Sequence, residues 1–351
     1  MSETRREDSE GAGPTTQAGD AEHASALIDQ HPTKPGEAIT AQPLPEATEV
    51  GDRSSLWGDA WRQLRRDPIF IASAILIAIF VLMAIIPQAF TFWIGGEDCA
   101  GTSRTTGEAC WQDPEYAELG RSAESPSSEH PFGFDVQGRD QVTRIIYGAR
   151  NSIAIGVSVT VGAIVIALAL GSLAGYLGKG FDAVTSRITD IFFAIPVTLA
   201  GIAFLNILPN RGIPEVAGVL IAFGWPTMMR IVRSQVISEK EREYVLAARA
   251  LGSGDIRIIT RHILPNSLAP VIVYATIFIG VIISAEATLS FLGVGLQLPA
   301  ISWGLMVSEA QSRLLQAPHL LLFPGIFISL TVFSFILMGD ALRDALDPRL
   351  R

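Results

Sequence analysis

The sequence has little charge, little cysteine and no strongly basic segment. Charged residues make up 17% of the 351 residues and hydrophobic residues 49%, whereas a soluble domain carries about 25% charged residues. The chain is therefore expected to meet lipid. Its net charge of −9 does not provide the basic footprint of a nucleic-acid-binding protein. Two cysteines are too few for a disulfide scaffold, an iron–sulfur cluster or a multi-cysteine zinc module.

Motifs for catalysis, metal binding and nucleotide binding are also missing from the sequence. It has no HExxH zinc pair and no Gly-x-Ser-x-Gly nucleophile elbow, and Gly178-Lys179-Gly180 lacks the flanking residues of a phosphate-binding loop. The five histidines are dispersed. We expect no catalytic residue, no metal and no cofactor. If the protein moves a solute against its concentration gradient, the energy must come from a reaction catalysed by another protein or from an ion gradient.

Composition changes sharply along the chain. Residues 1–55 are rich in acidic, small and polar residues, and such a segment cannot bury enough apolar surface to offset its ordering entropy. We predict a disordered tail there, with no apolar core of a signal peptide. The remainder is expected to form a first transmembrane helix with an outer loop (56–147), a membrane core (148–341) and a short C-terminal tail (342–351).

Six apolar stretches are long enough to cross a bilayer, which takes about 20 residues. They are continuous, unlike the alternating segments of a membrane β-barrel. The stretches are 69–92, 152–177, 188–208, 212–232, 267–292 and 319–338. The expected fold class is therefore an all-α integral membrane protein with six transmembrane helices.

Lys and Arg near the ends of the spans indicate the orientation. Arg62, Arg65 and Arg66 directly precede the first span, which favours a cytoplasmic N-terminus, and six spans return the C-terminus to the same side. This N-in/C-in topology, in the plasma or inner membrane, leaves a large extracytoplasmic connection over 93–151. A second polar connection, over 233–266, is then cytoplasmic.

Both cysteines lie in the outer connection. Cys99 and Cys110 would face an oxidising compartment, where a disulfide can persist. A disulfide between them is predicted, and two unpaired thiols are the alternative.

The outer connection ends in the motif HPFGFDVQGRD, residues 130–140. Its glycines suggest turns and its aspartates suggest caps. The residues singled out are Gly133, Asp135, Gly138, Arg139 and Asp140. From Gln141 onward apolar residues recur at helical spacing, so an amphipathic helix is expected to lie along the interface and then turn into the bilayer.

The inner connection has the pattern of two helices separated by a glycine turn. Residues 238–251 are strong helix formers, and Gly252 would end that helix as a C′ glycine. Ser253 or Asp255 could cap a second short helix, which Pro265 would end. A cytoplasmic loop this structured is expected to dock a soluble partner, and a capped connector is the alternative.

Few ionisable residues lie within the predicted spans, where they are costly and often functional. Asp190 either pairs with Arg187 or lies on a pathway. Glu286, deeper in the fifth span, either lines a polar path or holds the external loop. A proton or sodium relay needs several such groups, and their scarcity weakens the case for an ion-coupled transporter.

Gly171 and Gly175 form a small-xxx-small pattern in the second predicted span. Such a pattern allows two helices to approach closely. The pattern is common and is compatible with packing inside the chain or against a partner.

The stretch YVLAARALG at 244–252, followed by HILPN at 262–266, resembles the EAA loop of the membrane subunits of binding-protein-dependent ABC importers. The family pattern is Glu-Ala-Ala, three residues, Gly and then a sequence close to Ile-x-Leu-Pro. Leu246 occupies the glutamate position, and Glu243 lies one turn earlier. The residues assigned to an ATPase-coupling loop by this resemblance are Glu243, Ala247, Ala248, Gly252, Ile263, Leu264 and Pro265.

Four further segments resemble the dipeptide, oligopeptide and nickel subfamily. They are the motif at 130–140, with Phe134 where Thr is usual, and the segments 147–152, 289–295 together with 302–304, and 339–349. Five matches in order are specific, and together they cover about 56–351. The combination resembles a permease of the DppC/OppC type.

The resemblance implies a membrane permease subunit of an ATP-driven importer of dipeptides or oligopeptides. Such a chain forms half of the pathway beside a second homologous permease. Cytoplasmic ATP-binding subunits hydrolyse ATP and dock on the EAA loop, and an extracytoplasmic substrate-binding protein delivers the substrate, so the chain itself is not an enzyme. Alternatives are a nickel or other small-solute permease, an ion-coupled secondary transporter, and a membrane-bound enzyme, which the missing catalytic residues disfavour.

Overall fold

The computed structural model describes residues 56–94 and 119–347. Within these residues the regular structure is helical, with one isolated β-bridge between Phe134 and Asp140. The helices are α2 (Leu56–Leu64), α3 (Pro68–Ile85), α4 (Pro87–Ile94), α5 (Gln141–Leu177), α6 (Lys179–Ala194), α7 (Val197–Leu205), α8 (Ile213–Glu239), α9 (Glu243–Ala250), α10 (Asp255–Arg257), α11 (Leu264–Phe291), α12 (Trp303–Ala310) and α13 (His319–Leu346). Short 3-10 turns cover Leu119–Arg121 and Gln311–Arg313, and a π-helical turn covers Ile258–Ile263. The all-α prediction is confirmed for the described residues.

Five described helical segments are long and apolar enough to cross a membrane, and six if one bent pair counts as a span. Two of the predicted spans are broken. The stretch 188–208 divides into α6 and α7, whose axes differ by 80°, and 69–92 divides into α3 and α4. Each break precedes a proline, Pro196 or Pro87, because the proline ring disfavours helical geometry in the residue before it.

The prediction of an interfacial helix that turns into the bilayer after Gln141 is wrong, as helix α5 shows. It is one continuous helix of 37 residues, about 55 Å long at 1.5 Å per residue. Asp140 caps its N-terminus by accepting a hydrogen bond from the Thr143 N–H at 2.8 Å. No proline interrupts the run, so the amphipathic and apolar parts share one axis that is longer than a hydrocarbon core of about 30 Å.

The connection around 233–266 also differs from the prediction. Helix α8 continues to Glu239 and α9 begins only at Glu243, so no single helix covers 238–251. The N-cap of α10 is Gly254, and neither Ser253 nor Asp255 provides a side-chain cap. Pro265 lies in the first turn of α11 and does not end a helix. A proline is tolerated there because the N–H groups of a first turn need no helical partner.

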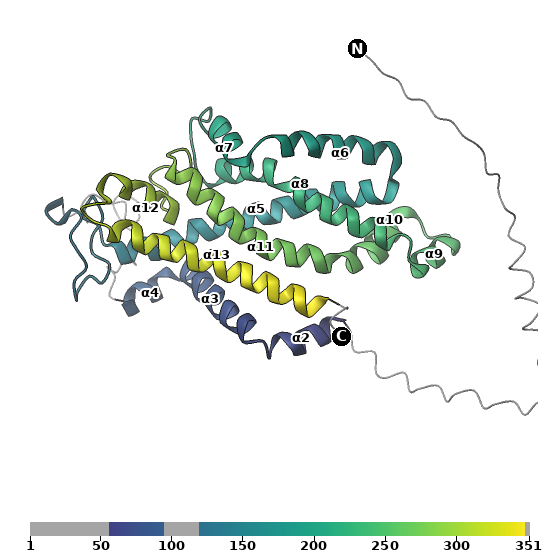
Figure 1. The fold of residues 1–351 in the computed structure, drawn as a ribbon, viewed down its shortest axis with the longest axis horizontal. Helices are drawn as coiled ribbons and strands as arrows, with labels where there is room; N and C mark the ends of the chain where they lie inside the picture. Colours follow the sequence, from purple (N-terminus) through teal and green to yellow (C-terminus); the bar gives the residue numbers. More distant parts are fainter. Residues whose placement is uncertain (1–55, 95–118, 348–351) are drawn as a thin grey trace, which may run out of the picture. The chain divides into compact units, whose positions relative to one another are not determined.

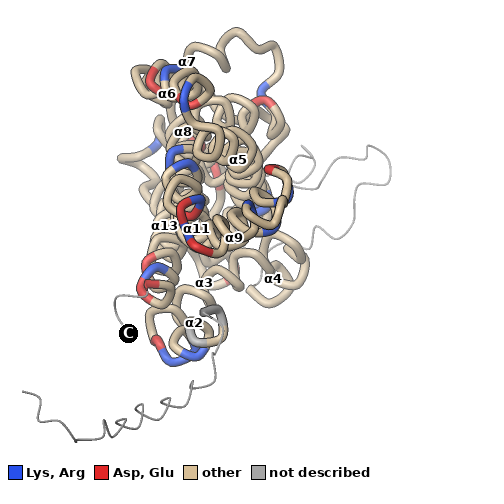
Figure 2. Tube along the Cα trace, turned by 90° about the vertical axis from the view of Figure 1, so that its right-hand side faces the viewer, with Lys and Arg blue, Asp and Glu red and all other residues tan. Residues whose placement is uncertain are grey.

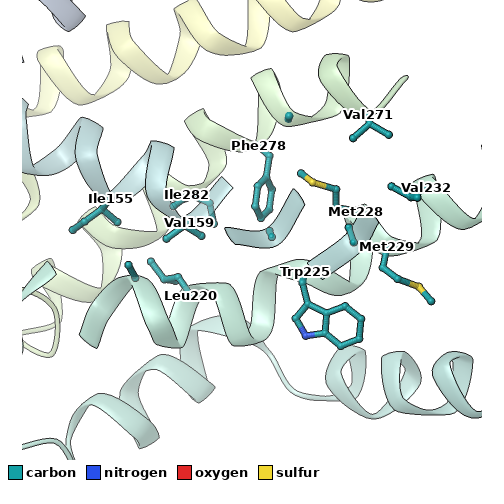
Figure 3. Close-up of a cluster of buried hydrophobic side chains, with 14 of the residues drawn as sticks. Ile155, Val159, Leu220, Trp225, Met228, Met229, Val232, Val271, Phe278 and Ile282 are labelled. Carbon is teal, nitrogen blue, oxygen red and sulfur yellow. The ribbon is translucent and has the colours of Figure 1, made fainter. Parts of the chain in front are cut away.

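The apolar core lies where α5, α8 and α11 meet, and α13 and α3 complete the bundle (Figure 1). Figure 3 shows buried side chains from the three central helices facing one another, among them Val159, Leu220 and Phe278. Gly171 and Gly175 lie on α5 against α8. A Cβ atom on Gly171 would come within 2.9 Å of the Met229 carbonyl oxygen, and one on Gly175 within 2.8 Å of that of Arg233. The small-xxx-small pattern therefore serves packing inside the chain.

The two ends of this bundle carry different short elements (Figure 1). At the α9 end lie α2, α9, α10 and the C-terminal ends of α5, α8 and α13. At the α12 end lie α12 and the N-terminal ends of α5 and α13. The sequence motifs gather at these two ends, so each end is a candidate functional region.

Candidate functional site

The segment that resembles the EAA loop forms α9, a glycine turn, α10 and the π-helical turn, and we call residues 240–263 the α9 loop. Gly252 has a φ of +80°, as expected for a C′ glycine. Its N–H donates to the Arg249 carbonyl at 3.0 Å, and the Ser253 N–H donates to the Ala248 carbonyl at 3.1 Å. This pair of bonds is a Schellman motif, so the predicted end of the first helix is confirmed.

One face of the α9 loop is buried and the other is open. Val245, Ala248 and Ile263 are buried against the bundle. Glu243, Ala247 and Gly252 are exposed; directly after the loop, in the first turn of α11, Leu264 is half-buried and Pro265 is exposed. Three large apolar side chains are exposed on the open face, Leu246 (49%), Leu251 (88%) and Ile256 (79%), beside charged ones such as Arg257 and Arg261. Exposed apolar side chains on a short, well-anchored loop suit contact with a protein partner.

Tyr244 fastens the start of the α9 loop to two helices. Its hydroxyl donates to Glu239 Oε2 at 2.5 Å at the end of α8, and it accepts from Asn266 Nδ2 at 3.2 Å at the start of α11. Burial, with the hydrogen bond to Glu239, raises the pKa of Tyr244 to about 12. Sequence reasoning did not assign Tyr244 a role, although it is the first residue of the matched stretch.

A second tyrosine fastens the other part of the α9 loop. The Tyr176 hydroxyl, in the last turn of α5, donates to Asp255 Oδ1 at 2.6 Å. Arg249 Nη2 donates to the same hydroxyl at 3.4 Å. The α9 loop is therefore joined by side chains to α5, α8 and α11, and no local sequence signal predicted this.

At the α12 end, the motif at 130–140 surrounds a buried ion-pair cluster. The Arg144 side chain, 2% exposed, contacts the Asp135 carboxylate through Nη1 and donates from Nη2 to Glu309 Oε2 at 2.7 Å. Arg139 Nε donates to Asp135 Oδ2 at 2.7 Å. Burial and then the neighbouring Arg144 lower the pKa of Arg139, while Asp135 and Glu309 oppose that shift. The cluster fixes the motif to α5 and α12.

The other motif residues shape this turn. Gly133 and Gly138 have φ values of +72° and +75°, as the predicted turns require. Asp135 Oδ1 accepts the N–H groups of Gln137 and Arg139, each at 2.8 Å. Asp140, besides capping α5, contacts His130 Nδ1 through Oδ1 at 3.2 Å. The predicted turn and cap roles at this motif agree with these contacts.

Segments 147–152 and 302–304, which are far apart in the sequence, meet in the structure. Trp303 is fully buried, its Nε1 donates to the Ile145 carbonyl at 2.8 Å and its N–H donates to Ser152 Oγ at 3.2 Å. Asn151 Nδ2 donates to the Ile301 carbonyl at 2.6 Å. These contacts hold the start of α12 against α5.

Glu286 is fully buried in α11. Its Oε1 accepts from Ser290 Oγ at 2.7 Å and from Ser302 Oγ at 2.9 Å, and Ser302 is the N-cap of α12. Asp190 lies nearer the α9 end, where it pairs with Arg230 at 2.7 Å and with Arg187 at 3.7 Å. Asp190 therefore has the contact with Arg187 that its structural alternative predicts. Glu286 contacts the residue that caps α12, as the loop-holding alternative predicts.

Several predictions concern residues outside the described part of the chain. Cys99, Cys110 and the predicted tail over 1–55 lie there. Within residues 56–94 and 119–347, no group of three or more His, Cys, Asp or Glu side chains is placed to share a metal ion.

A helical chain with five or six candidate spans and a well-anchored exposed loop has the organisation of a multi-pass membrane component. Residues 167–351 match the family of binding-protein-dependent transport system inner membrane components, and residues 55–93 match the N-terminal transmembrane domain of oligopeptide transport permease C. The chain belongs to this family of ABC importer permeases. The resemblance inferred from the motifs is therefore confirmed, as is the multi-pass membrane location.

Similar proteins extend over nearly the whole chain. A dipeptide transport system permease, DppC of Alkalihalophilus pseudofirmus, is 40% identical over 335 residues, which cover 94% of this chain and 99% of that protein. OppC of Bacillus subtilis, an oligopeptide transport permease, is 36% identical over 87% of this chain and 94% of its own. GsiD of Pectobacterium atrosepticum, a glutathione transport permease, is 38% identical over 84% and 92%. Family membership implies ATPase and substrate-binding partners.

Proposed function

We propose that this chain is a permease subunit of an ATP-driven importer of dipeptides or oligopeptides. The observation that carries the substrate class is the match to a dipeptide permease over 99% of that protein's length. In this proposal the chain forms half of the translocation pathway, and a second homologous permease forms the other half. It has no ATP site of its own, and separate cytoplasmic subunits hydrolyse ATP.

The proposed topology is N-in/C-in, which makes the α9 end cytoplasmic and the α12 end extracytoplasmic. In this proposal residues 1–55 and 342–351 are cytoplasmic, and the latter begin with the last residues of α13. Residues 56–147 form the first transmembrane segment with its outer loop, and 148–341 form the permease core. An extracytoplasmic binding protein delivers the substrate to the α12 end. The ion-pair cluster around Asp135 and Arg144 supports a fixed outer surface there.

The α9 loop is the proposed docking site for the ATPase. Its exposed small and apolar residues, with Ala247, Leu251 and Gly252 open to a partner, support this role. The buried side, with Val245 and Ile263, would pass the motion of the partner to the bundle. Coupling by this loop would explain why a transport subunit without a nucleotide motif carries a structured connection.

The substrate is tested by uptake in cells with and without this gene. We expect loss of uptake of a labelled dipeptide, restored by the intact chain on a plasmid. Labelled glutathione and radioactive nickel are measured in the same cells, because they represent other substrates of related permeases. Loss of nickel uptake alone would contradict the peptide proposal, and dependence on membrane potential without an ATPase would favour a secondary transporter.

Coupling is tested by Gly252→Asp, which places charge and bulk on the docking face. We expect the protein to remain in the membrane while substrate uptake is lost and ATP hydrolysis by the assembled importer no longer responds to substrate. Gly293→Asp is the matched control, since Gly293 is also exposed, has a φ of +77° and open space around it, and lies outside the α9 loop. Normal uptake by a well-expressed Gly252→Asp variant would refute the docking role.

Glu286 remains a candidate for the pathway. Glu286→Gln keeps the size of the side chain and an oxygen that can accept from Ser290 and Ser302, but removes the charge. If the carboxylate acts on the pathway, uptake falls while the protein stays folded. Normal uptake by this variant would exclude the pathway role of the charge and would support the loop-holding role of Glu286.

A further inference from the structure

We propose that α2 and the turn after it form a binding site for the headgroup of an anionic phospholipid, built from Trp61, Arg65 and Arg66. Only residues 65–67 separate the end of α2 from the start of α3, which is a candidate membrane span. Helix α2 therefore lies at the level where the apolar part of the bilayer ends, whichever way the chain crosses it.

The buried face of α2 holds the helix in place. Ala60 and Leu64 are 2% and 5% exposed, and they pack against Ala341 and Ala345 near the C-terminal end of α13. Figure 1 shows α2 beside that end of α13. The helix is thus a fixed part of the bundle, and its outer face has a defined position relative to the membrane.

The outer face combines an aromatic ring with two cations. Trp61 is 49% exposed, and the guanidinium carbon of Arg65 lies 4.9 Å from the centre of its ring. Arg66 is also exposed. Figure 2, which looks onto the α9 end, shows basic positions on α2.

Among the side chains that the structure describes, which do not include that of Asp59, neither Arg65 nor Arg66 forms an ion pair. Other arginines at the same end do, since Arg230 pairs with Asp190. The neighbouring Asp67 accepts the Ile69 N–H at 2.8 Å and caps α3. An external anion would therefore complete this face.

A membrane phosphate is the anion that fits this position. Tryptophan side chains favour the bilayer interface, and an amphipathic helix with basic residues and Trp lies in that plane. The planar guanidinium group binds phosphate oxygens in pairs. A phospholipid also has acyl chains that can lie beside the exposed Trp61 ring, whereas a free phosphate ion has none.

The test uses the full chain reconstituted in phosphatidylcholine vesicles that contain an equal share of brominated phosphatidylglycerol or brominated phosphatidylcholine. Bromine quenches nearby tryptophans, and the signal of Trp61 is the difference between the wild-type protein and Trp61→Phe. Each arginine near an anionic surface contributes roughly fivefold to binding. For the two arginines together we therefore expect phosphatidylglycerol to be enriched about 25-fold beside Trp61, with stronger quenching than by phosphatidylcholine.

The double variant Arg65→Gln/Arg66→Gln should remove this excess quenching while keeping the quenching by brominated phosphatidylcholine, which reports that α2 still lies at the bilayer. Arg257→Gln/Arg261→Gln removes the same charge from exposed residues of the α9 loop and should leave the excess intact. Equal quenching of the wild type by the two lipids, or excess quenching that survives in the first variant, would overturn the proposal. Loss of the excess on adding inorganic phosphate, but not chloride at equal ionic strength, would show a soluble phosphate site and would also overturn it.

Discussion

Tyr176 and Asp255, 79 residues apart in the sequence, are joined by a hydrogen bond of 2.6 Å. The bond connects the last turn of α5 to the first residue of α10. The Arg249 guanidinium lies over the same tyrosine, 5.6 Å from its ring centre. A force on the α9 loop therefore has a direct route, through one hydroxyl, to a helix that runs the length of the bundle.

The first prediction concerns this hydroxyl. Tyr176→Phe removes the hydrogen bond and keeps the ring. A hydrogen bond of this kind contributes about 1 kcal/mol, so we expect roughly a fivefold drop in substrate transported per ATP hydrolysed by the assembled importer. Asp255→Asn retains an acceptor oxygen and should behave nearly as the wild type. An unchanged ratio in Tyr176→Phe, with normal amounts of protein in the membrane, would show that the bond does not transmit motion.

A second prediction follows from the titration of Tyr244. Burial and the hydrogen bond to Glu239 raise its pKa from an ordinary value of 10.0 to about 12. Because the folded state holds the proton more tightly, this contribution to stability is complete below pH 10 and is lost as pH rises towards 12. Phenolate absorbance should show a step near pH 12 that is missing in Tyr244→Phe. A step near pH 10 that depends on Tyr244 would contradict the structure.

Local sequence patterns predicted helices, and the end of a helix, correctly where a long apolar run or a single glycine is sufficient. The long apolar runs predicted helices, and Gly252 ended α9 because a left-handed residue stops a helix. Prolines were less informative. Pro87 and Pro196 coincide with breaks, yet Pro226 and Pro324 lie inside α8 and α13. A membrane helix can accept a proline when its neighbours satisfy the freed backbone groups, and a single sequence does not show those neighbours.

Contacts between distant segments could not be predicted either, because a single sequence does not show which residues are neighbours in space. No local pattern gives Arg144 a role, because its partner Glu309 lies 165 residues away. Tyr176 gave no signal, because a tyrosine at the end of an apolar run is also common at membrane interfaces. Asp135 was found through the glycine-rich motif, which is local. The candidate sites were thus located by motifs, but the side chains that anchor them were not.

A third prediction separates glycines that are needed for packing from those that are not. Gly171→Ala would bring a Cβ atom within 2.9 Å of the Met229 carbonyl oxygen, and such overpacking costs about 1–3 kcal/mol. Gly218→Ala, inside α8, meets no atom within 4 Å and should gain up to about 1 kcal/mol of helix propensity. Thermal unfolding in detergent should therefore shift in opposite directions. Equal shifts would contradict the close approach of α5 and α8.

The last prediction concerns the buried cluster at the α12 end. Arg144→Met removes the cation that joins Asp135 to Glu309 and leaves two carboxylates with one arginine, Arg139. Breaking a buried ion pair in this way costs about 3–5 kcal/mol, so the thermal unfolding midpoint in detergent should fall by several degrees. Arg150→Met is the control on the same helix, because Arg150 is exposed and a surface change of this kind stays within about 0.5 kcal/mol. Arg144→Lys should recover only part of the loss, since an ammonium group lacks the fork that reaches both carboxylates. Equal midpoints for Arg144→Met and Arg150→Met would mean that the cluster does not hold the motif in place.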